Sequence, residues 1–129
     1  MTAKILYIED NQQNFYLVDY ILKARGHLVS WAKEGAEGLK AAAAAPPDLV
    51  LLDIQLPGMD GYAVAKALKG DPALARIPVI ALTSYAMAGD RQKAMEAGCD
   101  GYIEKPLNPQ TFAAQIESFL AAGRPQEKK

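Results

Sequence analysis

The sequence has little cysteine, almost no net charge and no long hydrophobic run. Its single cysteine, Cys99, excludes an intramolecular disulfide and a zinc cluster built from cysteines. With 14 basic and 15 acidic residues, the chain lacks the basic surplus of an electrostatic nucleic-acid binder. No apolar run approaches the roughly 20 residues that cross a bilayer, and the first residues do not resemble a signal peptide. We therefore expect a cytoplasmic protein that binds neither nucleic acid nor membrane.

What the chain does have is a regular alternation of two kinds of segment. Short apolar runs and amphipathic stretches follow one another along its 129 residues, as in a parallel sheet covered by helices. The apolar runs predict strands at Lys4–Glu9, His27–Trp31, Asp48–Leu52, Pro78–Leu82 and Gly101–Glu104. The stretches between them predict helices at Asn14–Arg25, Gly35–Ala44, Asp60–Lys69, Ala88–Ala97 and Pro109–Ala122. Residues 1–122 are thus predicted to form one domain, and residues 123–129 a flexible polar tail.

Five strand–helix units are too few for a closed eight-stranded barrel, so the expected fold is an open, doubly wound α/β sheet. The flavodoxin-like strand order 2-1-3-4-5 suits a chain of this length. In that order the first and third strands are neighbours, and a ligand crevice opens beyond their carboxyl ends. The residues that follow these strands are therefore the first candidates for a functional site.

Polar side chains follow four of the five predicted strands. Glu9 and Asp10 end the first strand and Asp53 follows the third, so three carboxylates would meet at the crevice. Their repulsion would be costly without a cation, and oxygen ligands beside a phosphate site favour Mg²⁺. Thr83 follows the fourth strand and Lys105 the fifth, which adds a hydroxyl and an ammonium group. Together these groups suit phosphoryl transfer, in which a carboxylate attacks while cations neutralise the phosphoryl oxygens.

Each of these residues also has an ordinary structural alternative when it is taken alone. Asp10 could cap the helix that follows it, as Asp60 could cap the helix at Asp60–Lys69. Asp53 could be a turn residue, Thr83 a helix cap, and Lys105 a surface charge paired with Glu104. Complementary chemistry at four strand ends favours a functional site over separate structural roles.

Four segments of the sequence carry a family resemblance. They are IEDN at Ile8–Asn11, DIQLPGMDG at Asp53–Gly61, ALTSYA at Ala81–Ala86 and GYIEKP at Gly101–Pro106. In this order and spacing they resemble the receiver domain of two-component response regulators, the CheY-like fold. The resemblance covers about Ala3 to Leu120, nearly the whole chain.

The resemblance implies a role for each residue of the predicted site. Asp53 would accept a phosphoryl group from a histidine kinase or a histidine phosphotransfer protein. Asp10 and Asp53 would ligate Mg²⁺ together with the backbone carbonyl of Gln55, and Glu9 would act through water. Lys105 would pair with the phosphoryl oxygens and hold Pro106 in a cis peptide bond.

The resemblance also implies a switch. Thr83 would donate a hydrogen bond to the phosphoryl group, and Tyr102 would swing inward behind it. This movement would change the face formed by the predicted elements at 88–97, 101–104 and 109–122, where a downstream protein docks. Gln55 and Tyr85 would tune the loss of phosphate, with Tyr85 obstructing the attacking water. An exposed Tyr85 at a partner interface is the alternative.

The resemblance is closest to single-domain regulators of the DivK type, although receivers excised from hybrid histidine kinases share the same segments. No DNA-binding or enzymatic module follows the last predicted helix, and the initial methionine and charged tail favour a stand-alone protein. The expectation is a monomeric signalling switch with no metabolic substrate, which catalyses its own phosphorylation and its own slow dephosphorylation.

Three other functions stay open on the sequence. A phosphatase of the haloacid-dehalogenase type would carry a D-x-D motif after the first strand, where this chain has EDNQ. A nucleotide or flavin protein would have the same fold, but the chain lacks G-x-x-x-x-G-K-[ST] and lacks G-x-G-x-x-G after the first strand. A pure interaction module would have a vestigial acidic pocket.

Three remaining residues receive no functional role. The only histidine, His27, is expected at the surface or at a helix end, because it follows the first predicted helix. Cys99 is expected to be a small, semi-buried residue. Trp31 is expected to pack at the end of the second strand.

Overall fold

The computed structural model describes residues 2–56, 58–83 and 89–122. Its five strands are β1 (Lys4–Ile8), β2 (Leu28–Ala32), β3 (Leu49–Asp53), β4 (Val79–Thr83) and β5 (Gly101–Glu104). Its five helices are α1 (Gln12–Lys23), α2 (Gly35–Ala44), α3 (Gly61–Gly70), α4 (Asp90–Glu96) and α5 (Phe112–Ala122). All strand pairs are parallel and the order is β2-β1-β3-β4-β5, which confirms the predicted topology.

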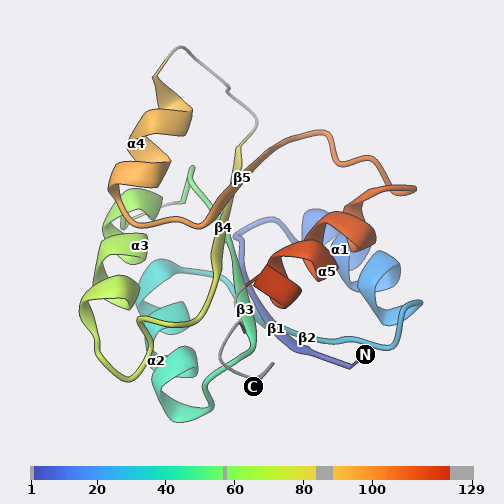
Figure 1. Ribbon diagram of the computed structural model, residues 1–129, viewed down its shortest axis with the longest axis horizontal. Helices are drawn as coiled ribbons and strands as arrows, with labels where there is room; N and C mark the ends of the chain where they lie inside the picture. Colours follow the sequence, from blue (N-terminus) through green and yellow to red (C-terminus); the bar gives the residue numbers. More distant parts are fainter. Residues whose placement is uncertain (1, 57, 84–88, 123–129) are drawn as a thin grey trace.

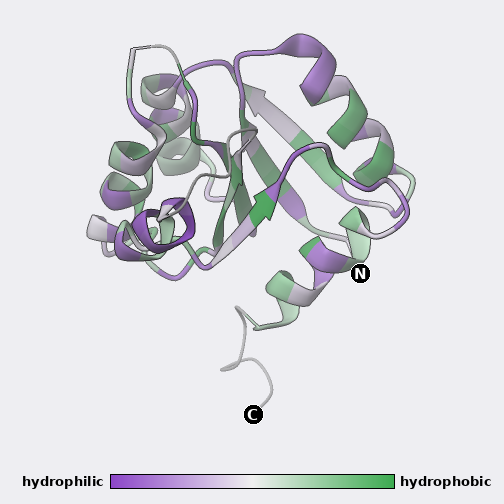
Figure 2. Cartoon of the chain, turned by 90° about the horizontal axis from the view of Figure 1, so that it is seen from above, coloured by the Kyte–Doolittle hydropathy of each residue, from purple (hydrophilic) through white to green (hydrophobic). Residues whose placement is uncertain are grey.

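Two helix layers cover the sheet, with α1 and α5 on one face and α2, α3 and α4 on the other (Figure 1). The alternation of side chains along each strand builds both interfaces. In β1, Ile5 and Tyr7 pack towards α1 and α5, whereas Leu6 and Ile8 pack towards α2 and α3. In Figure 2 the hydrophobic colour runs along the central strands, and several connecting loops are hydrophilic. Because β3 and β4 are buried on both faces, they read as continuous apolar runs.

Most element ends differ from the predicted ones by one to three residues, and local hydrogen bonds explain the starts of two helices. Helix α1 begins at Gln12 because the Asn11 side chain caps it by accepting from the Asn14 N–H at 3.0 Å. Asn11, and not Asp10, is therefore the cap of this helix. Helix α5 begins at Phe112 because Asn108 holds the preceding residues in a turn, with its side chain accepting from the Gln110 N–H at 2.9 Å. Asp60 caps α3, as predicted.

The structure places His27 at a helix end, one of the two predicted positions, because its N–H donates to the Leu22 carbonyl in the last turn of α1 at 3.1 Å. The other predicted position, the surface, is wrong, because the residue is buried. Its Nδ1 accepts a hydrogen bond from the Ala3 N–H at 3.1 Å, so Nε2 carries the proton of the neutral ring and donates to Glu117 at 2.9 Å. Arg25 also pairs with Glu117. The sequence around His27 did not reveal this partner, because Glu117 lies on α5, far away in the chain.

A packing test follows from Gly38, which lies on the inner side of α2. A Cβ at this position would lie 2.4 Å from Ile8 Cδ1. Helix propensity alone predicts that Gly38→Ala stabilises the protein by ~1 kcal/mol. We expect the opposite, a loss of about 1–3 kcal/mol in the free energy of unfolding by urea, because Ile8 must leave its packed position.

Gly70→Ala is the matched control, because a Cβ there would meet nothing within 4 Å. This variant is expected to be as stable as the wild type or slightly more stable. A Gly38→Ala protein more stable than the wild type would show that Ile8 repacks without cost.

Candidate functional site

The sheet order brings the predicted site residues to one edge. β1 lies beside β3, with Ile8 opposite Leu52, so the junction after β1 lies next to Asp53 at the end of β3. β4 flanks β3 on the other side and ends at Thr83. Lys105 directly follows β5, the next strand along. Parallel strands carry their carboxyl ends to the same edge, which is why these residues meet.

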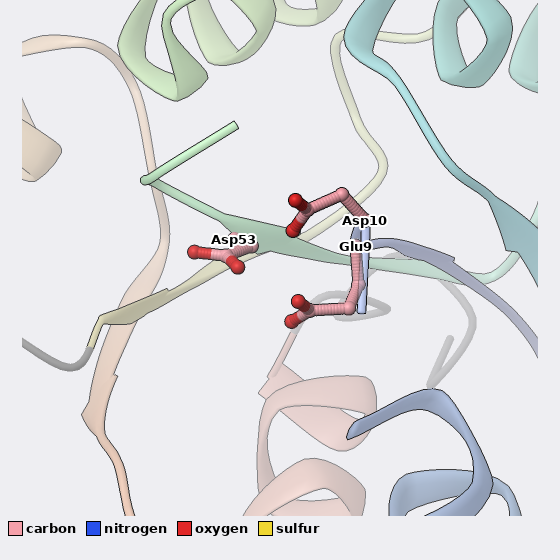
Figure 3. A group of neighbouring side chains, drawn as sticks. All are labelled: Glu9, Asp10 and Asp53. Carbon is pink, nitrogen blue, oxygen red and sulfur yellow. The ribbon is translucent and has the colours of Figure 1, made fainter. Parts of the chain in front are cut away.

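Three carboxylates lie close together at this edge (Figure 3). One oxygen from each of Glu9, Asp10 and Asp53 lies within 4.8 Å of the other two. Glu9 and Asp53 are buried, whereas Asp10 is exposed. The strand alternation places Glu9 on the same face as Tyr7, and Asp53 on the same face as Leu51. Both buried carboxylates therefore turn towards the layer of α1 and α5.

Lys105 compensates part of this negative charge. Its Nζ lies 2.9 Å from Glu9 Oε1 and 3.3 Å from Asp53 Oδ2. The pairing with Glu104 that the sequence allowed is not the one formed. The Lys105–Pro106 peptide bond is cis, as the family resemblance implied.

Glu9 accepts hydrogen bonds from four groups. Besides Lys105, the Tyr7 hydroxyl donates to Oε1 at 2.8 Å, and the Asn11 N–H and Asn14 Nδ2 donate to Oε2 at 3.2 and 3.3 Å. Tyr7 and Asn14 are site residues that the sequence interpretation missed. The signal for Tyr7 was present, because residues two apart on a strand share a face.

The electrostatic environment shifts the pKa values of the two buried carboxylates in opposite directions. Burial acts to raise the pKa of Glu9, but hydrogen bonds from Lys105 and Tyr7 outweigh it and the net pKa is lowered. Burial and the neighbouring Glu9 charge raise the pKa of Asp53 to about 6. Burial, with the Glu9 charge, also raises the pKa of Tyr7 far above its ordinary value, so its hydroxyl remains a donor. Asp53 is thus the carboxylate with the less compensated charge.

Gln55 links the two polar groups at the ends of β3 and β4. Its N–H donates to Asp53 Oδ1 at 2.9 Å, and its side-chain Nε2 donates to Thr83 Oγ1 at 2.9 Å. Thr83 is buried, so it ends β4 inside the site rather than capping a helix. Tyr102 is buried on β5, and its hydroxyl has no hydrogen-bond partner among the described residues. Tyr85 lies outside the described residues.

The donor set fits a small divalent cation. Carboxylate oxygens are the ligands that Mg²⁺ prefers, and this cation takes one or two carboxylates beside phosphate groups. Asp10 is exposed and Asp53 has the less compensated charge, so these two are the best available ligands. Glu9 is already occupied by its four donors, which fits an indirect role better than direct ligation.

Comparison with known proteins identifies relatives along nearly the whole chain. Residues 5–117 match the family model of the response regulator receiver domain. The chain is 41% identical over 120 residues to the polar-differentiation response regulator DivK of Brucella ovis, covering 93% of this chain and 98% of the relative. The DivK of Brucella anthropi is 40% identical over the same length.

Solved structures share the fold. The receiver domain of a sensor histidine kinase from Pseudomonas aeruginosa superposes with a TM-score of 0.85 at 28% identity, covering 94% of this chain and 99% of that one. That structure is described with a magnesium ion coordinated in its active-site cleft. NtrX from Brucella abortus matches with a TM-score of 0.90 at 28% identity, over 99% of this chain but 29% of the longer protein. Among the described residues, no helix is long and apolar enough to cross a membrane.

Asp53→Asn is expected to raise the free energy of unfolding by about 1–3 kcal/mol at pH 7 in Mg²⁺-free buffer. The raised pKa means that the folded protein holds the Asp53 charge at a cost, and each pKa unit corresponds to about 1.4 kcal/mol. Lys105 keeps Glu9 as its partner in the variant. The cost is fully present above pH 6 and disappears below the pKa of the unfolded state, which is about 4.

Urea unfolding in steps from pH 7 to pH 4 measures this difference. The stability gap between variant and wild type should shrink as the pH falls, and added Mg²⁺ should shrink it at pH 7. Asp19→Asn on α1 is the control for the loss of one carboxylate elsewhere. A gap independent of pH would contradict the assignment of the cost to Asp53.

Proposed function

Because the chain belongs to the receiver-domain family of two-component response regulators, we propose that Asp53 accepts a phosphoryl group and that this modification switches a protein-binding face. One observation carries the proposal. The Asp53 carboxylate is buried, lies 3.3 Å from the Lys105 ammonium and shares a cluster with Glu9 and Asp10. A nucleophile, a fixed cation and additional oxygen ligands are the parts that phosphoryl transfer requires.

The donor is a phosphohistidine of a histidine kinase or of a histidine phosphotransfer protein, the partners with which receiver domains interact. An Asp53 oxygen attacks the phosphorus atom, a P–O bond forms, and the P–N bond to the imidazole breaks. The leaving imidazole keeps the bonding electron pair and takes a proton from solvent. Lys105 remains close to Asp53 and pairs with the charge on the transferred phosphoryl oxygens.

Mg²⁺ is the cofactor that we assign to this site. Asp10, Asp53 and the backbone carbonyl of Gln55 would hold it, and Glu9 would act through water. When bound, the ion supplies positive charge that neutralises phosphoryl oxygens. The protein's own contribution is to keep Asp53 and Lys105 in place. The Gln55 N–H donates a hydrogen bond to Asp53, and Lys105 donates one to Glu9, which supports this role.

The switch runs through Thr83 and Tyr102. The Thr83 hydroxyl would turn to the phosphoryl group, and Tyr102 would move inward behind it. Two features support this role for Tyr102: its buried hydroxyl lacks a partner among the described residues, and Arg91 of α4 lies over its ring at 5.3 Å. A movement of the ring would therefore reach α4 and the face that α4, β5 and α5 form for a downstream protein.

The chain catalyses its own phosphorylation and slow dephosphorylation, which are typical of the family, and it has no metabolic substrate. Gln55 and Tyr85 would tune the access of water to the aspartyl phosphate. The chain would act as a cytoplasmic monomer. It is similar to DivK over 98% of that relative's length.

Incubation with acetyl phosphate tests the reaction directly. Intact-mass measurement should show one phosphoryl group on the protein in the presence of Mg²⁺ and none with EDTA. Asp53→Asn should remove the adduct, and Asp10→Asn should raise the Mg²⁺ concentration that is needed to form it. Absence of any adduct on the folded wild type, or an adduct that survives Asp53→Asn, would contradict the proposal.

Thr83→Ala separates the switch from the chemistry. We expect this variant still to gain the phosphoryl group, because Asp53 and Lys105 are intact. The ¹H–¹⁵N NMR shifts that phosphorylation causes in β5 and α4 should then be largely lost, since no hydroxyl reaches the phosphoryl group. Ser30→Ala, which removes an exposed hydroxyl from β2, should behave as the wild type. Unchanged shifts in phosphorylated Thr83→Ala would exclude Thr83 as the coupling residue.

A further inference from the structure

The turn after β1 carries two of the three clustered carboxylates, and edge strand β2 holds it by two hydrogen bonds. The Glu9 N–H donates to the Ala32 carbonyl at 2.9 Å. The Trp31 indole Nε1–H donates to the Glu9 carbonyl at 2.6 Å. Both backbone polar groups of Glu9 are therefore fixed by neighbouring residues of the same strand. The second of these bonds depends on a side chain, which a substitution can remove.

The indole that donates this bond is itself held in place. It stacks on the Phe15 ring of α1, with the ring centroids 4.8 Å apart and the planes 9° from parallel. Lys33 Nζ lies 5.2 Å from the indole centroid. Trp31 thus connects edge strand β2, which lies beside the turn, with α1, the helix that follows the turn in the sequence. A stacked ring keeps the direction of its N–H, because rotation would break the stack.

Asp10 depends on this backbone more than its neighbours do. Its exposed carboxylate accepts no hydrogen bond from the described residues, so no side-chain partner sets its position. The residues on either side are both held: Glu9 by β2, and Asn11 by its bond to the Asn14 N–H at 3.0 Å. The place of the Asp10 carboxylate therefore follows from where these two residues lie.

From this geometry we infer that Trp31 is a positioning residue for the cation site. Its hydrogen bond to the Glu9 carbonyl fixes the backbone next to Asp10 and thereby the position of the Asp10 carboxylate. The inference rests on the proposed function, because it assigns Asp10 as a ligand of Mg²⁺. Trp31 lies across β1 from Asp53, since β2 and β3 flank β1 on opposite sides. It touches no reacting atom, and its contribution is the geometry of the turn.

Trp31 is the only tryptophan of the sequence, so a tryptophan analogue without the indole N–H would replace this residue alone. Biosynthetic replacement of tryptophan by benzothienylalanine keeps a bicyclic ring for the stack on Phe15 and puts sulfur in place of the N–H. Calorimetric titration of this protein with Mg²⁺ should give binding about 3- to 10-fold weaker than that of the wild type. Trp31→Phe, which also keeps a ring and lacks the donor, should give a loss in the same range.

Phe15→Leu is the matched control, because it removes the stacked ring and keeps the indole donor. Its Mg²⁺ affinity should be closer to that of the wild type than the affinity of either variant without the donor. A packing role for Trp31 would lower the unfolding temperature equally with and without Mg²⁺. The positioning role lowers the Mg²⁺-dependent rise in unfolding temperature at low Mg²⁺ concentration.

Unchanged Mg²⁺ affinity in the benzothienylalanine protein and in Trp31→Phe would overturn the inference and leave the proposed function intact. A larger loss in Phe15→Leu than in these two would also overturn it, because the stack would then be the determinant. Failure of the wild type to bind Mg²⁺ would instead count against the proposed function, and the inference would fall with it. Asp10→Asn, titrated in parallel, verifies that the measured binding is at this site.

Discussion

The structure of the site depends on one constraint, the burial of two carboxylates beside each other with a single lysine between them. Glu9 and Asp53 are both buried, and Lys105 lies within 3.3 Å of each. Two negative charges and one positive charge leave a deficit of positive charge in a place with little water. The protein resolves the deficit unequally, since Glu9 receives four donors and Asp53 does not. Asp53 is therefore the buried carboxylate with the less compensated charge, which suits the proposed roles of nucleophile and cation ligand.

This unequal division explains why the residues around Glu9 matter as much as those around Asp53. Tyr7, Asn11 and Asn14 satisfy Glu9, which lets it anchor Lys105 at the edge of the sheet. A carboxylate with its oxygens occupied competes weakly for a cation. The exposed Asp10 is the second ligand that we propose, and we infer that its place depends on the backbone of the turn. The support for the site thus begins in β1 and β2, outside the cluster itself.

Much of the fold and the site could be predicted from the sequence because both follow from local patterns. Strand order and the meeting of Glu9, Asp53, Thr83 and Lys105 follow from the alternation of elements and from parallel topology. The burial of His27 could not be predicted, because its partner Glu117 lies 90 residues away. The bond from Trp31 to Glu9 was missed for a related reason, since it depends on the register of two strands. Side-chain contacts between different elements can be predicted only once the fold is known.

The alternation of side chains also separates the two halves of the proposed switch. Glu9 and Asp53 share the face of β1 and β3 that packs on α1 and α5. Thr83 shares the face of Ala81, whose neighbour on β5 is Tyr102, and this face packs on the layer of α2, α3 and α4. Gln55 reaches both groups, with its N–H on Asp53 and its side chain on Thr83. In the Gln55 contact Thr83 Oγ1 is the acceptor, whereas in the proposed switch the Thr83 hydroxyl would donate to a phosphoryl group on Asp53. Gln55 therefore connects Asp53, on one face of the sheet, with the residue on the other face that is proposed to turn towards it.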